Sequence, residues 1–186
     1  ENMAYPLPDM ERLIAKTQGK KFITVVDAWK SFWQLPLSEE FRKYTAFVVG
    51  DKLYEHTVLP MGLKSSPQLF QKFMHQVFGK MVGDFLDVYI DDCFITSDTF
   101  EEHLIHLDKF LTRWAEVGLL ANKEKCHFVM KQVKILGFIA DGEGLRIDRD
   151  RIRAVMDMAA PTNPQLVRSF CGTMSYFQKF IPNLQP

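Results

Sequence analysis

Three aspartates at the ends of short apolar segments are the residues best suited to chemistry. Asp91 and Asp92 are adjacent and lie between two β-rich runs, 85–90 and 93–96, so the pair is expected at a two-residue hairpin turn. Such turns favour Gly or Asn, and two like charges side by side repel each other. A divalent cation would offset that repulsion, because Mg²⁺ is held by one or two carboxylates plus substrate phosphates. An ordinary exposed turn remains the alternative interpretation of this stretch alone.

A third carboxylate, Asp27, ends another β-branched run at 22–26. If the two strands are neighbours in one sheet, Asp27 lies beside Asp91 and Asp92. Three carboxylates that meet on one sheet can hold two metal ions roughly 3.5–4 Å apart, an arrangement that carries out in-line phosphoryl transfer. The sequence therefore predicts a two-metal site at the ends of these strands.

The remaining chain alternates between strand and helix patterns that would hold these strands in place. Helical spacing and end signals predict helices at 9–19, from Ser65 onward with a Ser65–Gln68 capping box, from Thr99 to Gly118, from Asp148 onward, and at 165–180. Strands are expected at 22–26, 119–121, 126–130, 133–139 and 145–147, with a hairpin over 45–58 that turns at Gly50-Asp51. The apolar run 22–26 does not alternate, so it should be covered on both faces.

One of these helices carries both a predicted core stripe and a histidine pair. In the helix that Thr99 begins, the predicted buried stripe is Leu104, Leu107, Leu111 and Trp114. His103 and His106 are expected on its solvated face, not on a metal.

The composition is that of a globular domain. The chain has 186 residues, 47% of them hydrophobic and 25% charged, which suffices for one sizeable core, or for one domain with a small appendage. No apolar run approaches the length of a membrane span, and residues 1–4 do not resemble a signal peptide. The three cysteines are far apart and odd in number, which favours buried thiols in a reducing compartment.

Formal charge is zero overall but unevenly distributed. Residues 121–186 carry ten Lys or Arg against six Asp or Glu. This basic half could face phosphates, although a mixed solvated surface explains the asymmetry as well.

The segment Tyr89-Ile90-Asp91-Asp92 resembles the Y-x-D-D box of reverse transcriptases. Other stretches match motifs of gypsy-type (metavirus) enzymes of LTR retrotransposons in the same order, over nearly the whole chain. They are Tyr-Pro-Leu-Pro at 5–8, Val26-Asp27 with 32–35, Leu-Pro-Met-Gly-Leu-Lys-Ser-Ser-Pro at 59–67 with Phe70-Gln71, Ile-Leu-Gly-Phe at 135–138, and the 168–182 region.

This resemblance implies an α+β polymerase palm, with an antiparallel sheet packed on helices, a partial fingers hairpin and a C-terminal helical thumb portion. Fingers and palm would occupy residues 1–147, and the start of the thumb 148–186. The implied activity is RNA-directed DNA polymerisation, in which the primer 3′-hydroxyl attacks the α-phosphorus of a dNTP and pyrophosphate leaves.

The resemblance also assigns residues to roles. Catalysis and metal binding fall to Asp27, Asp91 and Asp92, with the backbone of Ala28 as a further metal ligand. Nucleotide binding falls to Lys30, Ser31, Phe32, Met61 and Gly62, and Phe32 would pack under the sugar and select deoxynucleotides. Template and primer contacts fall to Pro67, Tyr89, Leu136, Gly137 and Phe138.

The cofactors implied are two Mg²⁺ (or Mn²⁺) ions, and the partners are a dNTP and an RNA or DNA template with its primer. A second copy of the chain, or the RNase H and integrase parts of a polyprotein, would be further partners. No membrane is expected. The resemblance places the protein in the cytoplasm, in a virus-like particle, with the nucleus as an alternative.

Two departures from the family pattern keep alternatives open. The family has Gln or Phe where this chain has Met61, which bears on the fine nucleotide contacts. The family also has an earlier fingers segment with a basic pair, so a fragment or a natural remnant is expected. A catalytically inactive scaffold or nucleic-acid-binding subunit is therefore the second hypothesis. An unrelated metal-dependent phosphotransferase is the third.

Overall fold

The structure is a computed structural model that describes residues 5–135, 138–141 and 144–178. Its helices are α1 (Met10–Thr17), α2 (Glu39–Arg42), α3 (Ser66–Phe78), α4 (Phe100–Val117), α5 (Arg149–Met156) and α6 (Pro164–Tyr176), with short 3₁₀ turns at Ser31–Gln34, Lys43–Thr45 and Gly79–Met81. Its strands are β1 (Phe22–Asp27), β2 (Phe47–Val49), β3 (Lys52–Tyr54), β4 (Leu86–Tyr89), β5 (Asp92–Ser97), β6 (His127–Met130), β7 (Gln132–Ile135), β8 (Phe138–Asp141) and β9 (Gly144–Ile147).

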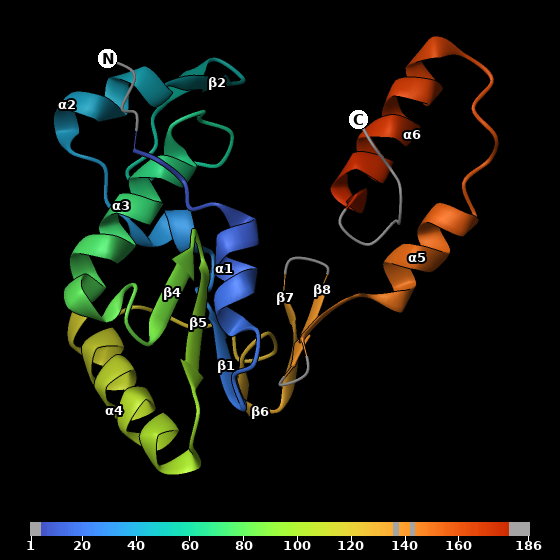
Figure 1. The fold of residues 1–186 in the computed structure, drawn as a ribbon. Coiled ribbons are helices and arrows are strands. Elements are labelled where there is room, and N and C mark those ends of the chain that lie inside the picture. The colour runs from blue at the N-terminus through green and yellow to red at the C-terminus, as the bar shows by residue number, and fades with distance from the viewer. Residues whose placement is uncertain (1–4, 136–137, 142–143, 179–186) are drawn as a thin grey trace.

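A four-stranded antiparallel sheet is the centre of the fold, in the order β4-β5-β1-β6 (Figure 1). Its strands are rich in β-branched and aromatic residues, which suit a pleated, buried surface. The pairing of β1 with β5 runs in unbroken register from Phe22 opposite Ser97 to Asp27 opposite Asp92. The C-terminal end of β1 therefore meets the β4–β5 turn.

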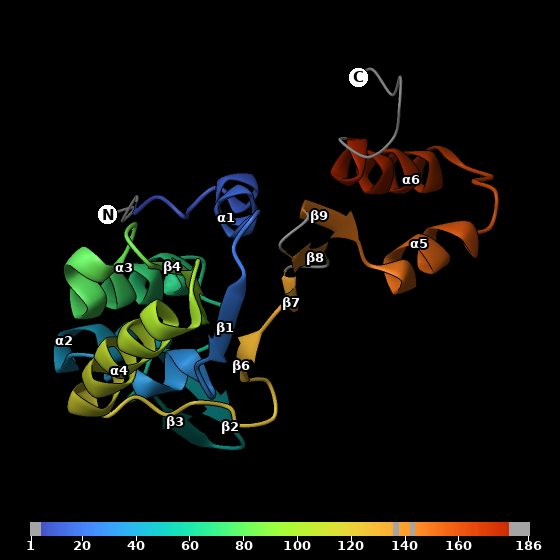
Figure 2. The ribbon, with the colours of Figure 1, turned by 60° about the horizontal axis from the view of Figure 1, so that its bottom comes forward.

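Helices α3 and α4 cover one face of this sheet (Figures 1 and 2). The residues that form this core cluster include Val26, Phe70, Met74, Phe78, Cys93, Ile95, Phe110 and Trp114. The rings of Phe78 and Phe110 stack with centroids 5.0 Å apart. Burying each such large side chain contributes about 1.5–3 kcal/mol, so this cluster is a main source of stability.

The opposite face packs against a second sheet, the antiparallel three-stranded β7-β8-β9. Ile23, Val25 and Phe94 of the first sheet meet Val133, Phe138 and Ala140 of the second. Strand β1 is therefore buried on both faces, as its unbroken apolar run predicted. The expected α+β architecture with an antiparallel sheet packed on helices is confirmed.

The buried face of α4 differs from the predicted stripe. The residues buried are His103, Leu107, Phe110 and Trp114, whereas Leu104 and Leu111 are exposed. The expectation that His103 lies on a solvated face is wrong. Its Nε2 lies 2.8 Å from Thr24 Oγ1, its Nδ1 lies 2.9 Å from Ser97 Oγ, and the side chain is fully buried. These two hydroxyls make a polar residue suitable for the core position.

Local predictions elsewhere had mixed outcomes. The expected strand 133–139 is two strands, β7 and β8, paired with Ile135 opposite Phe138. Residues 119–121 form no strand and contribute only an isolated bridge from Ala121 to Ala28. Thr99 caps α4 by accepting the Glu102 N–H, but the Ser65 side chain makes no such bond at α3. The Ser65–Gln68 capping box is therefore wrong.

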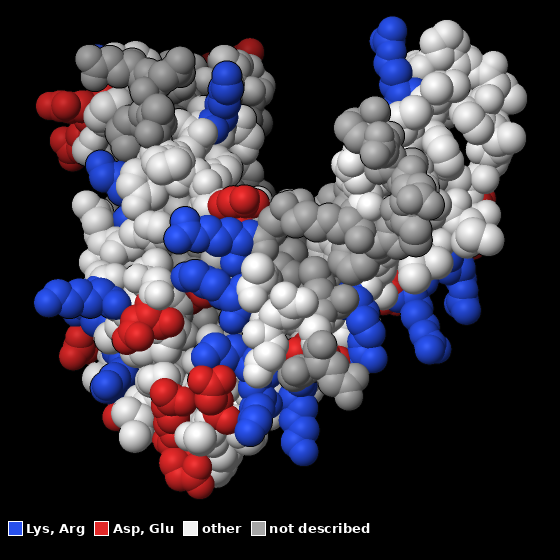
Figure 3. Space-filling model, in the orientation of Figure 1, with Lys and Arg blue, Asp and Glu red and all other residues white. Residues whose placement is uncertain are grey.

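The C-terminal helices α5 and α6 extend away from the sheets beyond β9 (Figures 1 and 2). Asp148 caps α5 by accepting the Asp150 N–H, and Asn163 caps α6 by accepting the Leu166 N–H. A wide notch separates these helices from the main body, and Lys and Arg side chains gather below it (Figure 3). Within the described residues, none of the helices has the length and apolarity that crossing a membrane requires.

The buried His103 generates a stability prediction. Burial lowers the pKa of His103, so the folded chain excludes a proton that the unfolded chain takes up once the pH falls below about 6.5. Stability should therefore fall as the pH drops through this range. His103→Leu should lower the free energy of unfolding by about 1–3 kcal/mol at pH 7.5, because the buried hydroxyls of Thr24 and Ser97 each lose their hydrogen bond to the imidazole.

Urea unfolding of both proteins at pH 7.5 and 5.5 checks this prediction. The difference between them should shrink at pH 5.5, because the variant lacks the titrating imidazole. Equal losses of stability on acidification would contradict the assigned role of His103.

Candidate active site

The sheet register brings two of the three predicted carboxylates together. Asp27 ends β1 directly opposite Asp92, which begins β5. Residues directly opposite on antiparallel strands have Cβ atoms about 4.5–5.5 Å apart. Strand alternation places both side chains on the same sheet face as Val25 and Phe94, away from α3 and α4. The predicted adjacency of β1 and the acidic hairpin is therefore present in the structure.

The hairpin turn lies one residue earlier than predicted. Tyr89 pairs with Asp92, so the two-residue turn is Ile90-Asp91, and Asp92 belongs to the strand. Ile90 has a φ of 55°, in the left-handed region that a β-branched residue rarely adopts. This conformation is strained, and it persists only where surrounding contacts enforce it.

The side chain of Gln71, on α3, supplies such contacts. Its Oε1 accepts the Ile90 N–H at 2.6 Å, and its Nε2 donates to the Val88 carbonyl oxygen at 3.0 Å. Gln71 is fully buried, so both bonds form away from water, where leaving them unmade would be costly. The Gln71 amide thus holds the strained turn from the sheet face that α3 and α4 cover.

Backbone bonds fix the other end of the site. The Ala28 N–H donates to the Asp91 carbonyl oxygen at 2.9 Å, which ties the residue after β1 to the turn. The Asn122 N–H donates to the Asp27 carbonyl oxygen at 2.8 Å, so the chain after α4 is bound to the same point. Ala28, predicted as a backbone metal ligand, is buried directly beside the carboxylates.

Burial and mutual repulsion perturb the carboxylates. Burial, together with the negative charges of Asp91 and Asp27, raises the pKa of Asp92 to about 6. Burial and the charge of Asp27 also raise the pKa of Asp91. Lys125 opposes both shifts: its Nζ lies 3.2 Å from Asp27 Oδ2, and this contact raises the pKa of Lys125 itself. The site is therefore an anionic cluster partly neutralised by one exposed ammonium.

The donor set suits a hard divalent cation that a substrate helps to bind. Within the described part of the chain, no three His, Cys, Asp or Glu side chains already form a metal cage. Mg²⁺ does not require one, because it is usually held by one or two carboxylates plus substrate phosphates. Asp27 and Asp92 lie side by side with Asp91 in the adjoining turn. The raised pKa values of Asp91 and Asp92 indicate that added positive charge would stabilise their ionised forms.

The residues predicted for nucleotide binding after β1 lie in a tight, aromatic segment. Ser31 is buried, and Phe32 packs edge-on against Phe70 with ring centroids 5.8 Å apart. Lys30 has a φ of 47°, and its Nζ lies 4.5 Å from the Trp29 ring centroid and 5.1 Å from that of Trp33. A phosphate contact by Lys30 would require its ammonium to leave these cation–π contacts.

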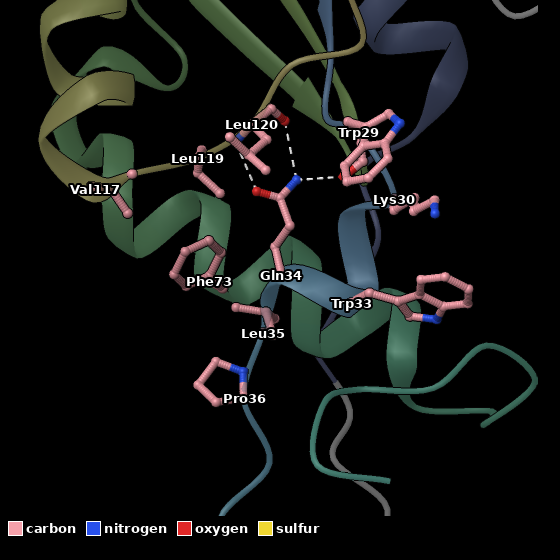
Figure 4. Close-up of a pocket in the computed structure, with 11 residues that line it drawn as sticks. Trp29, Lys30, Trp33, Gln34, Leu35, Pro36, Phe73, Val117, Leu119 and Leu120 are labelled. Carbon is pink, nitrogen blue, oxygen red and sulfur yellow. Dashed lines mark hydrogen bonds between the residues drawn. The ribbon is translucent and has the colours of Figure 1, made fainter.

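Figure 4 shows how this segment is fixed to the loop after α4. The Gln34 amide donates to the carbonyl oxygens of Trp29, at 2.6 Å, and Leu120, at 3.1 Å, and it accepts the Leu120 N–H at 2.8 Å. These bonds border a cavity of about 540 Å³, with Trp29 and Trp33 at its rim. The segment that carries Lys30, Ser31 and Phe32 is thereby held to the rest of the fold.

Met61 and Gly62 precede α3 and are exposed. Gly62 has a φ of 89° with no atom near the position that a Cβ would take, so its surface is open to a ligand. Pro67 lies in the first turn of α3. Exposure of this stretch leaves it available to a nucleotide or a template.

The predicted primer contacts are only partly placed. Tyr89 is half-buried and packs beside the second core cluster, next to Asp92 in the register. Phe138 is buried in that cluster, so its ring is a packing residue and not an exposed contact for a primer. Leu136 and Gly137 lie outside the described residues.

Sequence reasoning gave no individual role to Lys125, Gln71 or Gln34, although Gln34 and Gln71 lie within matched motifs. Gln71 carried a signal, because it is a polar residue beside the apolar positions Phe70 and Met74 of α3. Lys125 and Gln34 carried none, because their partners are distant in the sequence or belong to the backbone.

The structure resembles those of foamy viral protease-reverse transcriptases. The complex with double-stranded DNA gives a TM-score of 0.89 at 23% identity and covers 97% of this chain and 32% of that one. The complex with an RNA/DNA hybrid gives 0.85 at 23% identity, over 98% of this chain and 25% of that one. The expected polymerase fold is confirmed by this likeness.

Curated relatives include retroelement polyproteins. The Pol polyprotein of the Drosophila melanogaster transposon opus is 33% identical over 177 residues, which are 95% of this chain and 18% of the relative. That of the gypsy transposon of the same fly is 32% identical over 95% of this chain and 17% of the relative. The Cauliflower mosaic virus enzymatic polyprotein is 32% identical over 97% of this chain and 27% of the relative.

These matches confirm the expected similarity to gypsy-type enzymes, although the chain spans less than a fifth of the first two relatives. A family model described as reverse transcriptase (RNA-dependent DNA polymerase) matches residues 1–140. The chain belongs to the reverse transcriptase family.

Proposed function

We propose that this chain carries the catalytic centre of an RNA-directed DNA polymerase of a retroelement. The observation that supports this most strongly is the register that sets Asp27 opposite Asp92, with Asp91 in the adjoining turn, in a chain of this family. Residues 1–147 would form the palm with part of the fingers, and residues 148–186 the start of the thumb. A primed RNA or DNA template would occupy the notch between them (Figure 3).

Asp27 and Asp91 would bridge two Mg²⁺ (or Mn²⁺) ions, and Asp92 would be a weaker ligand or an electrostatic support. Bound there, such ions lower the pKa of the primer 3′-hydroxyl and stabilise negative charge on the leaving phosphate oxygens. The exposed Lys125 ammonium can move from Asp27 when other positive charge arrives, because its side chain is 65% exposed.

The chain itself contributes positioning. Gln71 and Ala28 hold the turn that carries Asp91, so the carboxylates need not reorganise when substrate binds. Phe32, supported edge-on by Phe70, would lie under the deoxyribose. Gly62 would let the incoming nucleotide approach the backbone closely. The whole polyprotein, with RNase H and integrase parts or a second copy of the chain, supplies the remaining functions in this proposal.

Neutralising either bridging carboxylate tests the proposal. Asp27→Asn and Asp91→Asn should each abolish primer extension, a loss of about 10³-fold or more, because charge that stabilises the transition state is lost. Both variants should fold, since removal of a buried negative charge relieves repulsion in the cluster. Extension of a labelled primer on an RNA template, with circular dichroism of the same samples, measures both outcomes.

Asp108→Asn is the matched control, because Asp108 is exposed on α4. It should extend primers at the wild-type rate. Substantial extension by either bridging variant would refute the assignment. A folded wild-type chain that binds primer–template without extending it would favour the inactive nucleic-acid-binding subunit instead.

Metal binding should depend on pH through Asp92. Because its pKa is about 6 in the absence of metal, Mg²⁺ must displace a proton from it at lower pH. The Mg²⁺ affinity should therefore fall by up to about tenfold per pH unit below pH 6 and level off above it. Calorimetric titrations at pH 5, 6, 7 and 8 measure this. The Asp92→Asn variant should bind Mg²⁺ more weakly at pH 8, and its Mg²⁺ affinity should depend less steeply on pH.

Phe32 should set the choice of sugar. Phe32→Ala removes the ring proposed to exclude a 2′-hydroxyl, so the preference for dNTP over NTP should fall by about 10–100-fold. The ratio of kcat/KM for the two substrates measures this preference. A similar drop in kcat/KM for both substrates, with an unchanged ratio, would show that Phe32 only packs against Phe70.

A further inference from the structure

A chain of side-chain hydrogen bonds leads from the N-terminal segment to the turn that carries Asp91. Tyr5 Oη lies 2.7 Å from His75 Nδ1, and His75 Nε2 lies 2.8 Å from Gln71 Nε2. Gln71 in turn binds the Ile90 N–H and the Val88 carbonyl oxygen. His75 therefore contacts the residue that holds the turn, and it does not contact the carboxylates.

Donor and acceptor chemistry fixes the state of His75. The Ile90 N–H can only donate and the Val88 carbonyl oxygen can only accept, so the orientation of the Gln71 amide is determined by the backbone. One Nε2 hydrogen of Gln71 is used by Val88, and the other points at His75 Nε2. That nitrogen must be an acceptor, so the imidazole is neutral, carries its proton on Nδ1 and donates it to Tyr5 Oη.

A protonated His75 does not fit this arrangement. Its Nε2–H would face the Gln71 N–H with two donors about 2.8 Å apart. Either the imidazole moves away or the Gln71 amide turns over, and a turned amide would place its NH₂ group against the Ile90 N–H. Ile90, already at a φ of 55°, would then lose the acceptor that holds it there.

The surroundings of His75 favour the neutral form. Burial lowers the pKa of His75. The charged groups that border the same cavity, of about 360 Å³, are Asp9 and Arg12, before and within α1, and Lys16 with its ion-pair partner Asp87 on β4. Lys72 lies one turn earlier on α3. Two cations and two carboxylates balance across the cavity, which leaves burial as the deciding influence.

We propose that His75 is a positioning residue for the catalytic turn, in that its neutral imidazole, held by Tyr5, keeps the Gln71 amide bound to Ile90. Its catalytic consequence rests on the proposed polymerase function, whereas the relay itself does not. Loss of the relay should lower the rate of the chemical step and leave primer–template binding unchanged, because the relay acts on the turn that carries Asp91 and contains none of the residues proposed to contact template or primer.

Nuclear magnetic resonance of the whole chain tests the relay without any activity. Ring ¹⁵N shifts of His75 should report the tautomer protonated at Nδ1. In a pH titration, the Ile90 amide shift should contain a step with the same midpoint as the His75 ring. In His75→Gln that step should vanish, because glutamine offers an acceptor to Gln71 but does not titrate. Steps caused by Asp91 and Asp92 should remain in both proteins.

His56→Gln is the matched control, because His56 packs against Phe47 near the β2–β3 hairpin and takes no part in the relay. It should leave the Ile90 titration unchanged. A His75 ring protonated at Nε2 when neutral, or an Ile90 step that survives in His75→Gln, would overturn the proposal.

Primer extension gives the second measurement. His75→Gln should retain the wild-type kcat at pH 8 within about twofold and lose less of it at pH 6 than the wild type does. His75→Arg places a permanent donor against Gln71 and should lower kcat at least about tenfold at both pH values, with unchanged primer–template affinity. If kcat falls by the same factor between pH 8 and pH 6 in the wild type and in His75→Gln, the proposed effect of His75 on the rate is refuted.

Absence of extension by every protein, wild type included, would count against the proposed function alone. The Ile90 titration would still decide the relay.

Discussion

Repulsion among three carboxylates is the constraint on which this structure depends. The β1–β5 register forces Asp27 and Asp92 into adjacent positions, and the β4–β5 turn adds Asp91. Burial prevents water from screening the three charges, and the pKa of Asp92 rises accordingly. A hairpin turn does not require acidic residues. Carboxylates held close together despite their mutual repulsion therefore indicate a site that binds positive charge.

The support for this site comes from one helix that serves two purposes. Phe70, Met74 and Phe78 of α3 bury the helical face of the sheet, and their packing fixes the helix. Gln71 lies on the same helix, so this packing also fixes its position, and its amide hydrogen-bonds the backbone at the β4–β5 turn. A turn with a β-branched residue at positive φ is unstable in isolation. The hydrophobic core therefore holds the turn that carries Asp91 through the buried Gln71 amide and through the packing of Ile90.

The two core clusters also explain where the site lies. Helices α3 and α4 cover one sheet face and the β7–β9 sheet packs on the other, while the carboxylates lie at the end of β1, in the β4–β5 turn and at the start of β5. The helices α5 and α6 stand across a notch from this body (Figure 3). A long, charged ligand such as a nucleic-acid duplex fits an open notch better than it fits an enclosed pocket.

The sequence by itself determined the buried strand β1 and the carboxylates at the strand ends, because an unbroken apolar run and the positions of the acids are local patterns. The α+β class and the adjacency of the two strands that bring Asp27 to the acidic hairpin were implied by the resemblance to reverse transcriptases. Only the tertiary structure decided that the turn is Ile90-Asp91, that His103 replaces Leu104 in the core, and that Lys125 and Gln71 support the site. Each depends on a register of one residue or on partners far along the chain, and the energy of such pairs exists only after the strands and helices have packed.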